Sequence, residues 1–321
     1  MLRRRECPRA RLCQRLIPQS NPSHKLMPHP FLPSTDALTE ATSIALVQAI
    51  QRQEIPSCLS AQPISTAFVH QGTGGTPIVL LHGFDSSVLE FRRLLPLLAA
   101  ESETWIVDLL GFGFTDRPAD VSISPAATKT HLHDFWKTLI DRPIVLVGAS
   151  MGGAAAIDFA LTYPDAVAKL VLIDSAGFAK APPSRFLVPP LGYLAAQFLR
   201  SPNVRRKVSL QAYCDPSFVT ADAELCAALH LSSPRWSDGI VAFTKSGGYN
   251  FLADEIPQIQ QPTLILWGDR DRILGTADAD KFRRAIAHAK FFWIENCGHV
   301  PHLEQPRLTA QHILKFINGF G

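Results

Sequence analysis

The chain has 321 residues, of which 46% are hydrophobic and 18% are charged, so it has ample apolar material for a large packed core. No apolar run approaches the ~20 residues that a membrane-spanning helix needs. The net charge is +3, but residues 1–26 alone carry +6 and the remainder carries −3. An acidic body argues against nucleic acid as its partner.

The first 33 residues are rich in arginine and proline, and this composition predicts a disordered extension. They lack the apolar region of a secretory signal. A targeting segment, an electrostatic tether to anionic lipid and a translation-start artefact with Met27 as the true start all stay open. The six cysteines are scattered without a C-x-x-C pair, so we expect reduced thiols. We therefore expect a protein that is cytoplasmic or peripheral on a membrane, and not secreted.

Apolar spacing predicts an amphipathic helix over residues 38–53. Residues 64–70 resemble an early edge strand, and a glycine-rich turn follows them. Residues 78–81 form an apolar run typical of a buried strand, which ends in the turn His82-Gly83-Phe84. A helix is expected over 91–100 and a strand over 104–108.

A further helix over 124–140 and a buried strand over 142–147 lead to Gly148-Ala149-Ser150-Met151-Gly152-Gly153. A helix is predicted directly after this motif, and a strand over 169–174. A serine at the G-x-S-x-G spacing on a strand–turn–helix is typical of a nucleophile elbow. The two glycines of the motif relieve clashes in so tight a turn. The serine hydroxyl then lies at a helix N-terminus, which favours developing negative charge.

The alternation of strands and helices stops near residue 177 and resumes near residue 262. We predict a helical cap over residues 178–261, inserted between two parts of one core, residues 34–177 and 262–321. Its proline-punctuated apolar segment either packs the cap on the core or contacts an apolar substrate or a membrane surface. The candidate substrate contacts are Phe186, Leu187, Leu191, Leu194, Phe198 and Tyr249.

Strands over 262–268 and 290–294 and a helix over 306–317 complete the chain. Buried strands that alternate with helices predict an α/β fold, with a mostly parallel central sheet and helices on both faces.

Ser150, an aspartate and His299 follow one another in the order of a hydrolase triad. The imidazole takes the proton of the serine hydroxyl, and a carboxylate orients the imidazole. The backbone N–H groups of Phe84 and Met151 are the expected oxyanion-hole donors. Two other histidines compete as base: His82, for which a turn-stabilising role is expected, and His302.

No histidine or cysteine cluster has the spacing of metal ligands, so neither a metal nor a cofactor is expected.

The elbow, the His-Gly-Phe turn, Gly268-Asp-Arg-Asp271 and Gly298-His-Val-Pro-His302 together resemble the α/β-hydrolase superfamily over roughly residues 60–320. The resemblance implies that the catalytic acid lies three residues after the glycine, at Asp271. Asp269 is then expected to stabilise the turn, and Asp174, after the preceding strand, is a remote alternative.

A closer resemblance joins His82-Gly-Phe-Asp-Ser-Ser87, Ser246-Gly-Gly-Tyr-Asn250 and Asn296-Cys-Gly-His299 to the chlorophyll dephytylases of photosynthetic organisms. It implies hydrolysis of the phytyl ester of chlorophyll or pheophytin, and peripheral contact with the thylakoid membrane. Ala149-Ser-Met151 departs from the Pro-Ser-Leu of that family.

Two alternative functions stay open. The first is a general carboxylesterase or carbon–carbon bond hydrolase for smaller substrates. The second is a hydrolase-fold receptor that binds an apolar ligand with little turnover.

Overall fold

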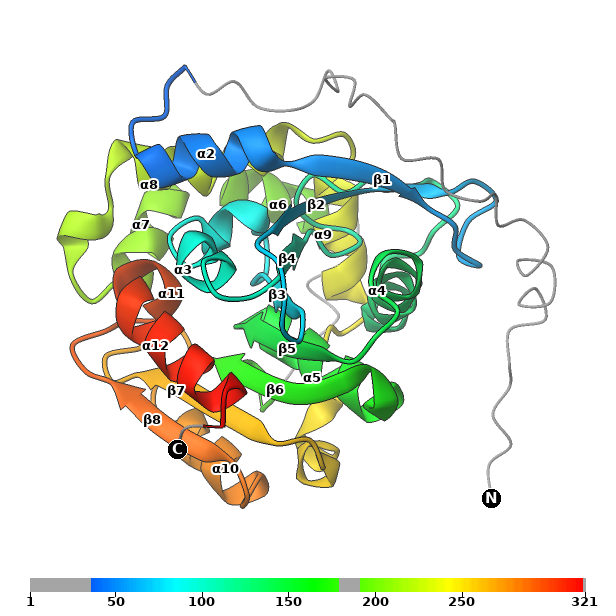
Figure 1. Ribbon diagram of the computed structural model, residues 1–321. Coiled ribbons are helices and arrows are strands. Elements are labelled where there is room, and N and C mark those ends of the chain that lie inside the picture. Colours follow the sequence, from blue (N-terminus) through cyan, green and yellow to red (C-terminus); the bar gives the residue numbers. More distant parts are fainter. Residues whose placement is uncertain (1–35, 179–190, 320–321) are drawn as a thin grey trace.

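The computed structural model describes residues 36–178 and 191–319, which form an eight-stranded sheet surrounded by helices (Figure 1). The strand order is β1-β2-β4-β3-β5-β6-β7-β8. β2 is antiparallel to β1 and β4, and the other neighbours are parallel. The predicted α/β fold with a mostly parallel sheet is confirmed. The predicted N-terminal extension and two candidate substrate contacts, Phe186 and Leu187, lie outside the described residues.

Strands and helices alternate along most of the chain. The strands are β1 Gln51–Ile55, β2 Ile64–Gln71, β3 Ile78–Leu81, β4 Thr104–Val107, β5 Ile144–Ala149, β6 Val167–Ile173, β7 Thr263–Gly268 and β8 Lys290–Ile294. The core helices are α2 Ala41–Ala49, η1 Val88–Phe91, α3 Leu95–Ala99, α4 Pro125–Leu139, α5 Met151–Thr162, η2 Pro164–Ala166, α10 Ala277–Ala285, α11 Pro301–Glu304 and α12 Pro306–Ile317. Between β6 and β7 come α6 Leu191–Arg200, α7 Pro202–Ala212, η4 Pro216–Phe218, α8 Ala221–Cys226, η5 Leu229–Ser232, α9 Trp236–Lys245, η6 Leu252–Asp254 and η7 Ile256–Gln258.

Successive side chains of the central strands enter different cores on the two faces of the sheet. In β3, Val79 and Leu81 join the core beneath α4, α5 and α10, whereas Ile78 and Leu80 join the core beneath α2, α3 and α12. In Figure 1, α3 and α12 lie on one side of the sheet and α4 on the other. Burial on both faces explains why these strands are continuous apolar runs in the sequence.

The predicted helix over 38–53 is wrong at its C-terminal end. The helix α2 ends at Ala49, and Gln51–Ile55 forms β1, which pairs antiparallel with β2. Only Ile55 of this strand is buried, so β1 lacks the apolar alternation that marks a strand in the sequence. Because β1 takes the edge of the sheet, residues 64–71 form the second strand rather than the predicted edge strand.

The predicted helix over 91–100 is shorter than expected. A 3₁₀ turn covers residues 88–91, and the α-helix α3 spans only Leu95–Ala99. The helix begins with a proline at its first turn, where the missing N–H costs least.

The described residues between β6 and β7 form helices over one end of the sheet. Trp236, Ile240 and Phe243 of α9 are buried in the same apolar core as α4 and α5. This segment, called the cap below, is therefore packed onto the sheet core through α9, while α6 packs on α9.

The parallel strands β3, β5, β6 and β7 lie next to one another, so their C-terminal ends meet at one edge of the sheet. The loop after β3 carries His82, and Ser150 follows β5. Asp174 and Asp271 follow β6 and β7. This edge is where open α/β sheets place their ligand sites.

Replacing Phe135 by alanine tests the core beneath α4. Phe135 is fully buried, with its ring 5.6 Å from that of Phe68 and 6.1 Å from that of Trp105. We expect Phe135→Ala to lower the free energy of unfolding by about 3–5 kcal/mol. The matched control Phe292→Ala, on the exposed face of β8, is expected to cost less than about 1 kcal/mol in the same denaturant titration. Equal losses would contradict the assignment of this core.

Candidate active site

Ser150 lies on a strained turn between β5 and α5. Its φ of 52° and ψ of −121° are values that residues with a side chain rarely adopt. A Cβ on Gly152 would lie 2.0 Å from the carbonyl oxygen of Leu81, so only glycine allows α5 to approach β3 this closely. The Ser150 N–H donates to the Ile173 carbonyl at 3.0 Å, and the Ser150 carbonyl accepts from the Ala176 N–H at 2.9 Å. The nucleophile is thereby tied to the end of β6.

His299 and Asp271 form a hydrogen-bonded pair. His299 Nδ1 lies 3.0 Å from Asp271 Oδ2. Asp271 Oδ1 accepts from the backbone N–H groups of Ile273 at 2.7 Å and Leu274 at 3.1 Å. These three donors hold the Asp271 carboxylate in one orientation. Because Nδ1 is engaged with Asp271, Nε2 is the ring nitrogen left for the serine hydroxyl.

A second carboxyl group, that of Asp174, lies beside this pair. One ligand atom from each of Asp174, Asp271 and His299 lies within 4.8 Å of the other two. Asp174 is fully buried, and its Oδ1 accepts from the Gly268 N–H at 3.0 Å. Burial, and then the negative charge of Asp271, raise the pKa of Asp174 well above its ordinary value. A raised pKa favours the protonated acid, which can donate a hydrogen bond to a neighbouring carboxylate. The structure thus brings Asp271 to the imidazole, with Asp174 supporting it.

The other candidates for the catalytic base and acid, His302 and Asp269, contact groups outside the His299–Asp271 pair. His302 Nε2 lies 3.2 Å from Glu90 Oε1. Asp269 Oδ1 accepts from the Cys297 N–H at 3.2 Å, which ties the loop after β7 to the loop that carries His299. His299 is therefore the one of the two C-terminal histidines that meets a β7-loop carboxylate.

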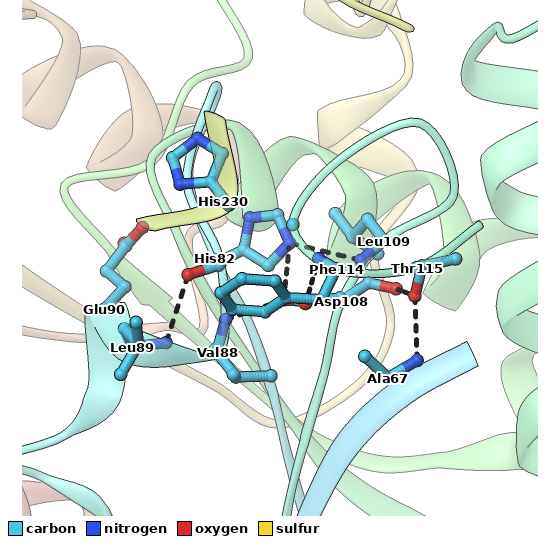
Figure 2. A network of polar contacts seen from close by, with 12 residues as sticks. Ala67, His82, Val88, Leu89, Glu90, Asp108, Leu109, Phe114, Thr115 and His230 are labelled. Carbon is cyan, nitrogen blue, oxygen red and sulfur yellow. Dashed lines mark hydrogen bonds and ion pairs between the residues drawn. The ribbon is translucent and has the colours of Figure 1, made fainter. Parts of the chain in front are cut away.

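His82 orients the peptide group that precedes the predicted oxyanion donor. Its Nε2 accepts from the Leu109 N–H at 3.1 Å (Figure 2), so Nδ1 carries the proton and donates to the Gly83 carbonyl at 2.8 Å. The Gly83 carbonyl and the Phe84 N–H belong to one planar trans peptide and point in opposite directions. Holding the carbonyl therefore aims the N–H. Burial lowers the pKa of His82 to about 4, which keeps the ring neutral.

A buried carboxylate, Asp108, braces the same region (Figure 2). It accepts from the N–H groups of Val88 and Phe114, each at 2.6 Å. These bonds connect the loop after β4 to the segment after the His-Gly-Phe turn, so these two loops are held together.

Glu90 is a site residue that sequence analysis missed. Its Oε2 accepts from the Gly83 N–H at 2.9 Å. Burial would raise the pKa of Glu90, but His302 and then other neighbouring groups together outweigh it, and the pKa is lowered to about 2. A Cβ on Gly83 would lie 3.4 Å from the Ser150 Cβ, so this loop lies against the nucleophile. The only sequence signal is a charged residue within the apolar run 88–91.

The two predicted oxyanion donors belong to the two segments that border the nucleophile. Phe84 belongs to the loop that Glu90 and His82 hold, and Met151 is the first residue of α5. The N–H groups in the first turn of a helix have no partner within the helix. Their dipoles favour the negative charge that develops on a carbonyl oxygen.

The predicted substrate contacts on α6 are exposed to solvent, whereas side chains that line a pocket would be largely covered. Leu191, Leu194 and Phe198 are 53%, 61% and 66% exposed, so they form the outer face of the helix. The sequence could not predict this exposure, because an amphipathic pattern does not say whether the apolar face of a helix is covered. Tyr249 is half-buried, with its ring 5.7 Å from that of Phe243.

An aromatic row that the sequence did not single out lies beside the oxyanion loop. Ring centroids are 5.7 Å apart for Phe84 and Phe112, and 5.1 Å for Phe112 and Phe243. Through Phe243 the row continues to Tyr249 and then to Phe251 on the surface. These rings come from the core loops and from the cap.

A serine on a strained turn after β5, a histidine–carboxylate pair and the His-Gly-Phe loop at one sheet edge form an arrangement typical of α/β hydrolases. The alpha/beta hydrolase family model matches residues 78–312, and the chain belongs to this family.

Three relatives illustrate the range of the family. The chain is 38% identical over 248 residues to the alpha/beta hydrolase domain-containing protein VTE7 of Arabidopsis thaliana, covering 76% of this chain and 74% of that protein. It is 27% identical to a 2-hydroxy-6-oxo-6-(2'-aminophenyl)hexa-2,4-dienoic acid hydrolase of Metapseudomonas resinovorans, covering 81% and 90%. A solved thermophilic esterase from Thermogutta terrifontis superposes with a TM-score of 0.71 at 26% identity, covering 84% and 99%.

Asparagine at each of the two aspartates separates their roles. Asp271→Asn removes the charge that stabilises the imidazolium, and we expect kcat on p-nitrophenyl butyrate to fall about 10⁴-fold. Asn at 174 reproduces the protonated acid, because it accepts from Gly268 and donates to Asp271, so we expect a change within about threefold. Circular dichroism checks that both variants are folded. A larger loss for Asp174→Asn than for Asp271→Asn would exchange the two assignments.

Proposed function

We propose that the protein is a serine esterase that needs no cofactor and cleaves a carboxylic ester with a large apolar alcohol. The preferred substrate of this proposal is the phytyl ester of chlorophyll or pheophytin. The observation that supports hydrolysis is the 3.0 Å hydrogen bond from His299 to Asp271, at the same sheet edge as the strained Ser150.

The reaction follows from the groups at this edge. Ser150 Oγ attacks the ester carbonyl while His299 Nε2 takes its proton, and the Phe84 and Met151 N–H groups bind the oxyanion. The C–O bond to the alcohol then breaks as His299 returns the proton to phytol. Water, deprotonated by His299, attacks the acyl-enzyme and releases chlorophyllide as its carboxylate.

The aromatic row supports a large, flat, apolar substrate. It begins at Phe84, the proposed oxyanion donor, and ends at the exposed ring of Phe251. Aromatic faces bind planar conjugated rings by stacking. Phe84 and Phe251 are each 41% exposed, whereas Phe112 and Phe243 are buried, so the ends of the row are the parts open to a substrate ring. Tyr249 of this row belongs to the Ser246-Gly-Gly-Tyr-Asn250 stretch on which the resemblance to the dephytylases depends.

A carboxylesterase or carbon–carbon bond hydrolase for smaller substrates is the second candidate. The names of two relatives, the thermophilic esterase and the dienoic acid hydrolase, favour it. The same serine, histidine and oxyanion donors serve both reactions, so only the substrate distinguishes them.

Chromatography of reaction products tests the proposal. Wild-type protein incubated with chlorophyll a and pheophytin a is expected to release the dephytylated pigment and phytol. Ser150→Ala is expected to lower the rate by at least about 10³-fold, because the nucleophile is lost. Hydrolysis of p-nitrophenyl butyrate without release of phytol would favour the second candidate. A failure to hydrolyse any ester, with Ser150 unlabelled by a fluorophosphonate, would favour a ligand receptor.

We further propose that α6 contacts an anionic membrane surface. Its outer face exposes Leu191, Leu194 and Phe198, and the exposed cations Arg200 and Lys207 lie nearby in the chain. Arg205 and Arg206 instead pair with Asp85 and Glu224. Exposed apolar side chains with flanking cations suit the interface of a bilayer with anionic headgroups. Within residues 36–178 and 191–319, no helix combines the length and the apolar character needed to cross a membrane.

Co-sedimentation with vesicles checks this surface. We expect the protein to bind phosphatidylcholine vesicles with about 30% phosphatidylglycerol, and Phe198→Glu to weaken binding at least about tenfold. The matched control Phe292→Glu places the same charge on an exposed phenylalanine of β8 and is expected to bind as wild type. Light scattering that shows a dimer broken by Phe198→Glu would assign the face to a second copy instead.

A further inference from the structure

Asp85, directly after the proposed oxyanion donor Phe84, is held by three side chains of the cap. Its Oδ1 accepts from Trp236 Nε1 at 2.7 Å and lies 3.1 Å from His230 Nε2. Its Oδ2 accepts from Arg205 Nη1 at 2.7 Å. These donors come from three separate elements, α9, η5 and α7.

The cluster is buried and its charges balance. Asp85, His230 and Trp236 are each at most about a tenth exposed, and Arg205 is largely covered. Burial would raise the pKa of Asp85, but the hydrogen bonds and charges of His230 and Arg205 outweigh it, so the pKa is lowered. Burial lowers the pKa of His230, and its Nδ1 has no hydrogen-bond partner among the described residues. His230 therefore contacts Asp85 through Nε2, and the Arg205 guanidinium supplies a positive charge beside the carboxylate.

The backbone at Asp85 has a positive φ of 50°. Most residues with a side chain rarely adopt this value, and aspartate tolerates it better than most. The side-chain bonds to the cap add to what holds this turn. A change in the backbone conformation of Asp85 would also displace the neighbouring Phe84. The ring of Phe84 lies 6.2 Å from that of Phe243 of α9, measured between centroids.

The two sides of the Phe84 N–H are thus anchored in different parts of the molecule. On the N-terminal side, His82 and Glu90 of the core hold Gly83. On the C-terminal side, the anchors belong to the cap. The direction of the Phe84 N–H consequently depends on where the cap sits.

We propose that Asp85 is a positioning residue through which the seated cap sets the oxyanion hole, so that the hole is fully formed only while Arg205, His230 and Trp236 hold this carboxylate. The inference rests on the proposed esterase function. It makes the cap a part of the catalytic geometry.

The experiment compares wild type, Asp85→Ala and Trp236→Phe in the full chain. Trp236→Phe keeps an aromatic ring and removes the Nε1–H donor. Displacing one oxyanion donor is expected to lower kcat on p-nitrophenyl butyrate about 30- to 100-fold in Asp85→Ala, with KM within about threefold. The inhibition constant of a trifluoromethyl ketone, which forms a tetrahedral oxyanion with Ser150, is expected to rise by about the same factor. Trp236→Phe is expected to show about a fivefold effect on both quantities.

The matched control is Asp222→Ala. Asp222 is another buried carboxylate of the cap, in α8. Like Asp85 it accepts three hydrogen bonds across the boundary with the core, but its donors lie at the start of α2: the N–H groups of Thr39 and Glu40 and the hydroxyl of Ser43. Its loss is expected to lower the thermal midpoint without changing kcat by more than about twofold. A purely structural role would lower the midpoint in both aspartate variants and leave kcat and the inhibition constant unchanged. That result, or an equal loss of kcat in Asp222→Ala, would overturn the proposal.

The test stays separate from that of the proposed function. If wild type hydrolyses no ester, the esterase proposal fails, and the rate at which a fluorophosphonate labels Ser150 replaces kcat. Slower labelling of Asp85→Ala and Trp236→Phe would support the role of Asp85 in forming the hole. Labelling at the wild-type rate in both variants would refute it.

Discussion

The close approach of α5 to the end of β3 is the contact on which the rest of the site depends. Gly152 allows it, because any side chain there would overlap the carbonyl of Leu81. The approach holds Ser150 in its strained turn and brings Gly83 against the Ser150 Cβ. The nucleophile, one end of a helix and the oxyanion loop therefore meet at one point before any cap residue is considered. The strain is stored in a backbone that β6 also holds through hydrogen bonds to Ser150.

Three carboxylates tie the cap to this core, and each makes hydrogen bonds across the boundary. Asp85 holds α7, η5 and α9 to the oxyanion loop. Glu304 accepts from the N–H groups of Gly298 and Cys214, so it holds the loop of His299 against the end of α7. Asp222 joins α8 to α2. A buried carboxylate without partners is costly, so each of these ties favours the local contact that it makes.

The apolar side chains of the cap face two ways. Those of α9 enter the core and meet Phe84 and Phe112, whereas those of α6 face outward. The exposed ring of Phe251 stands at the surface end of the aromatic row.

The sequence by itself determined the fold class, the order of strands β2 to β8 along the chain and the chemistry of the groups at their ends. Continuous apolar runs and a glycine-flanked serine are local signals, and each depends on a few neighbouring residues. Tertiary structure decided which groups meet. It placed His299 rather than His302 beside Asp271, set Asp174 next to that carboxylate, and put polar residues 51–55 on the sheet edge. It also turned the apolar face of α6 outward and brought Asp85 to three cap side chains more than 100 residues away. Local periodicity records that a face or a loop exists, but its partner is fixed only when distant segments pack together.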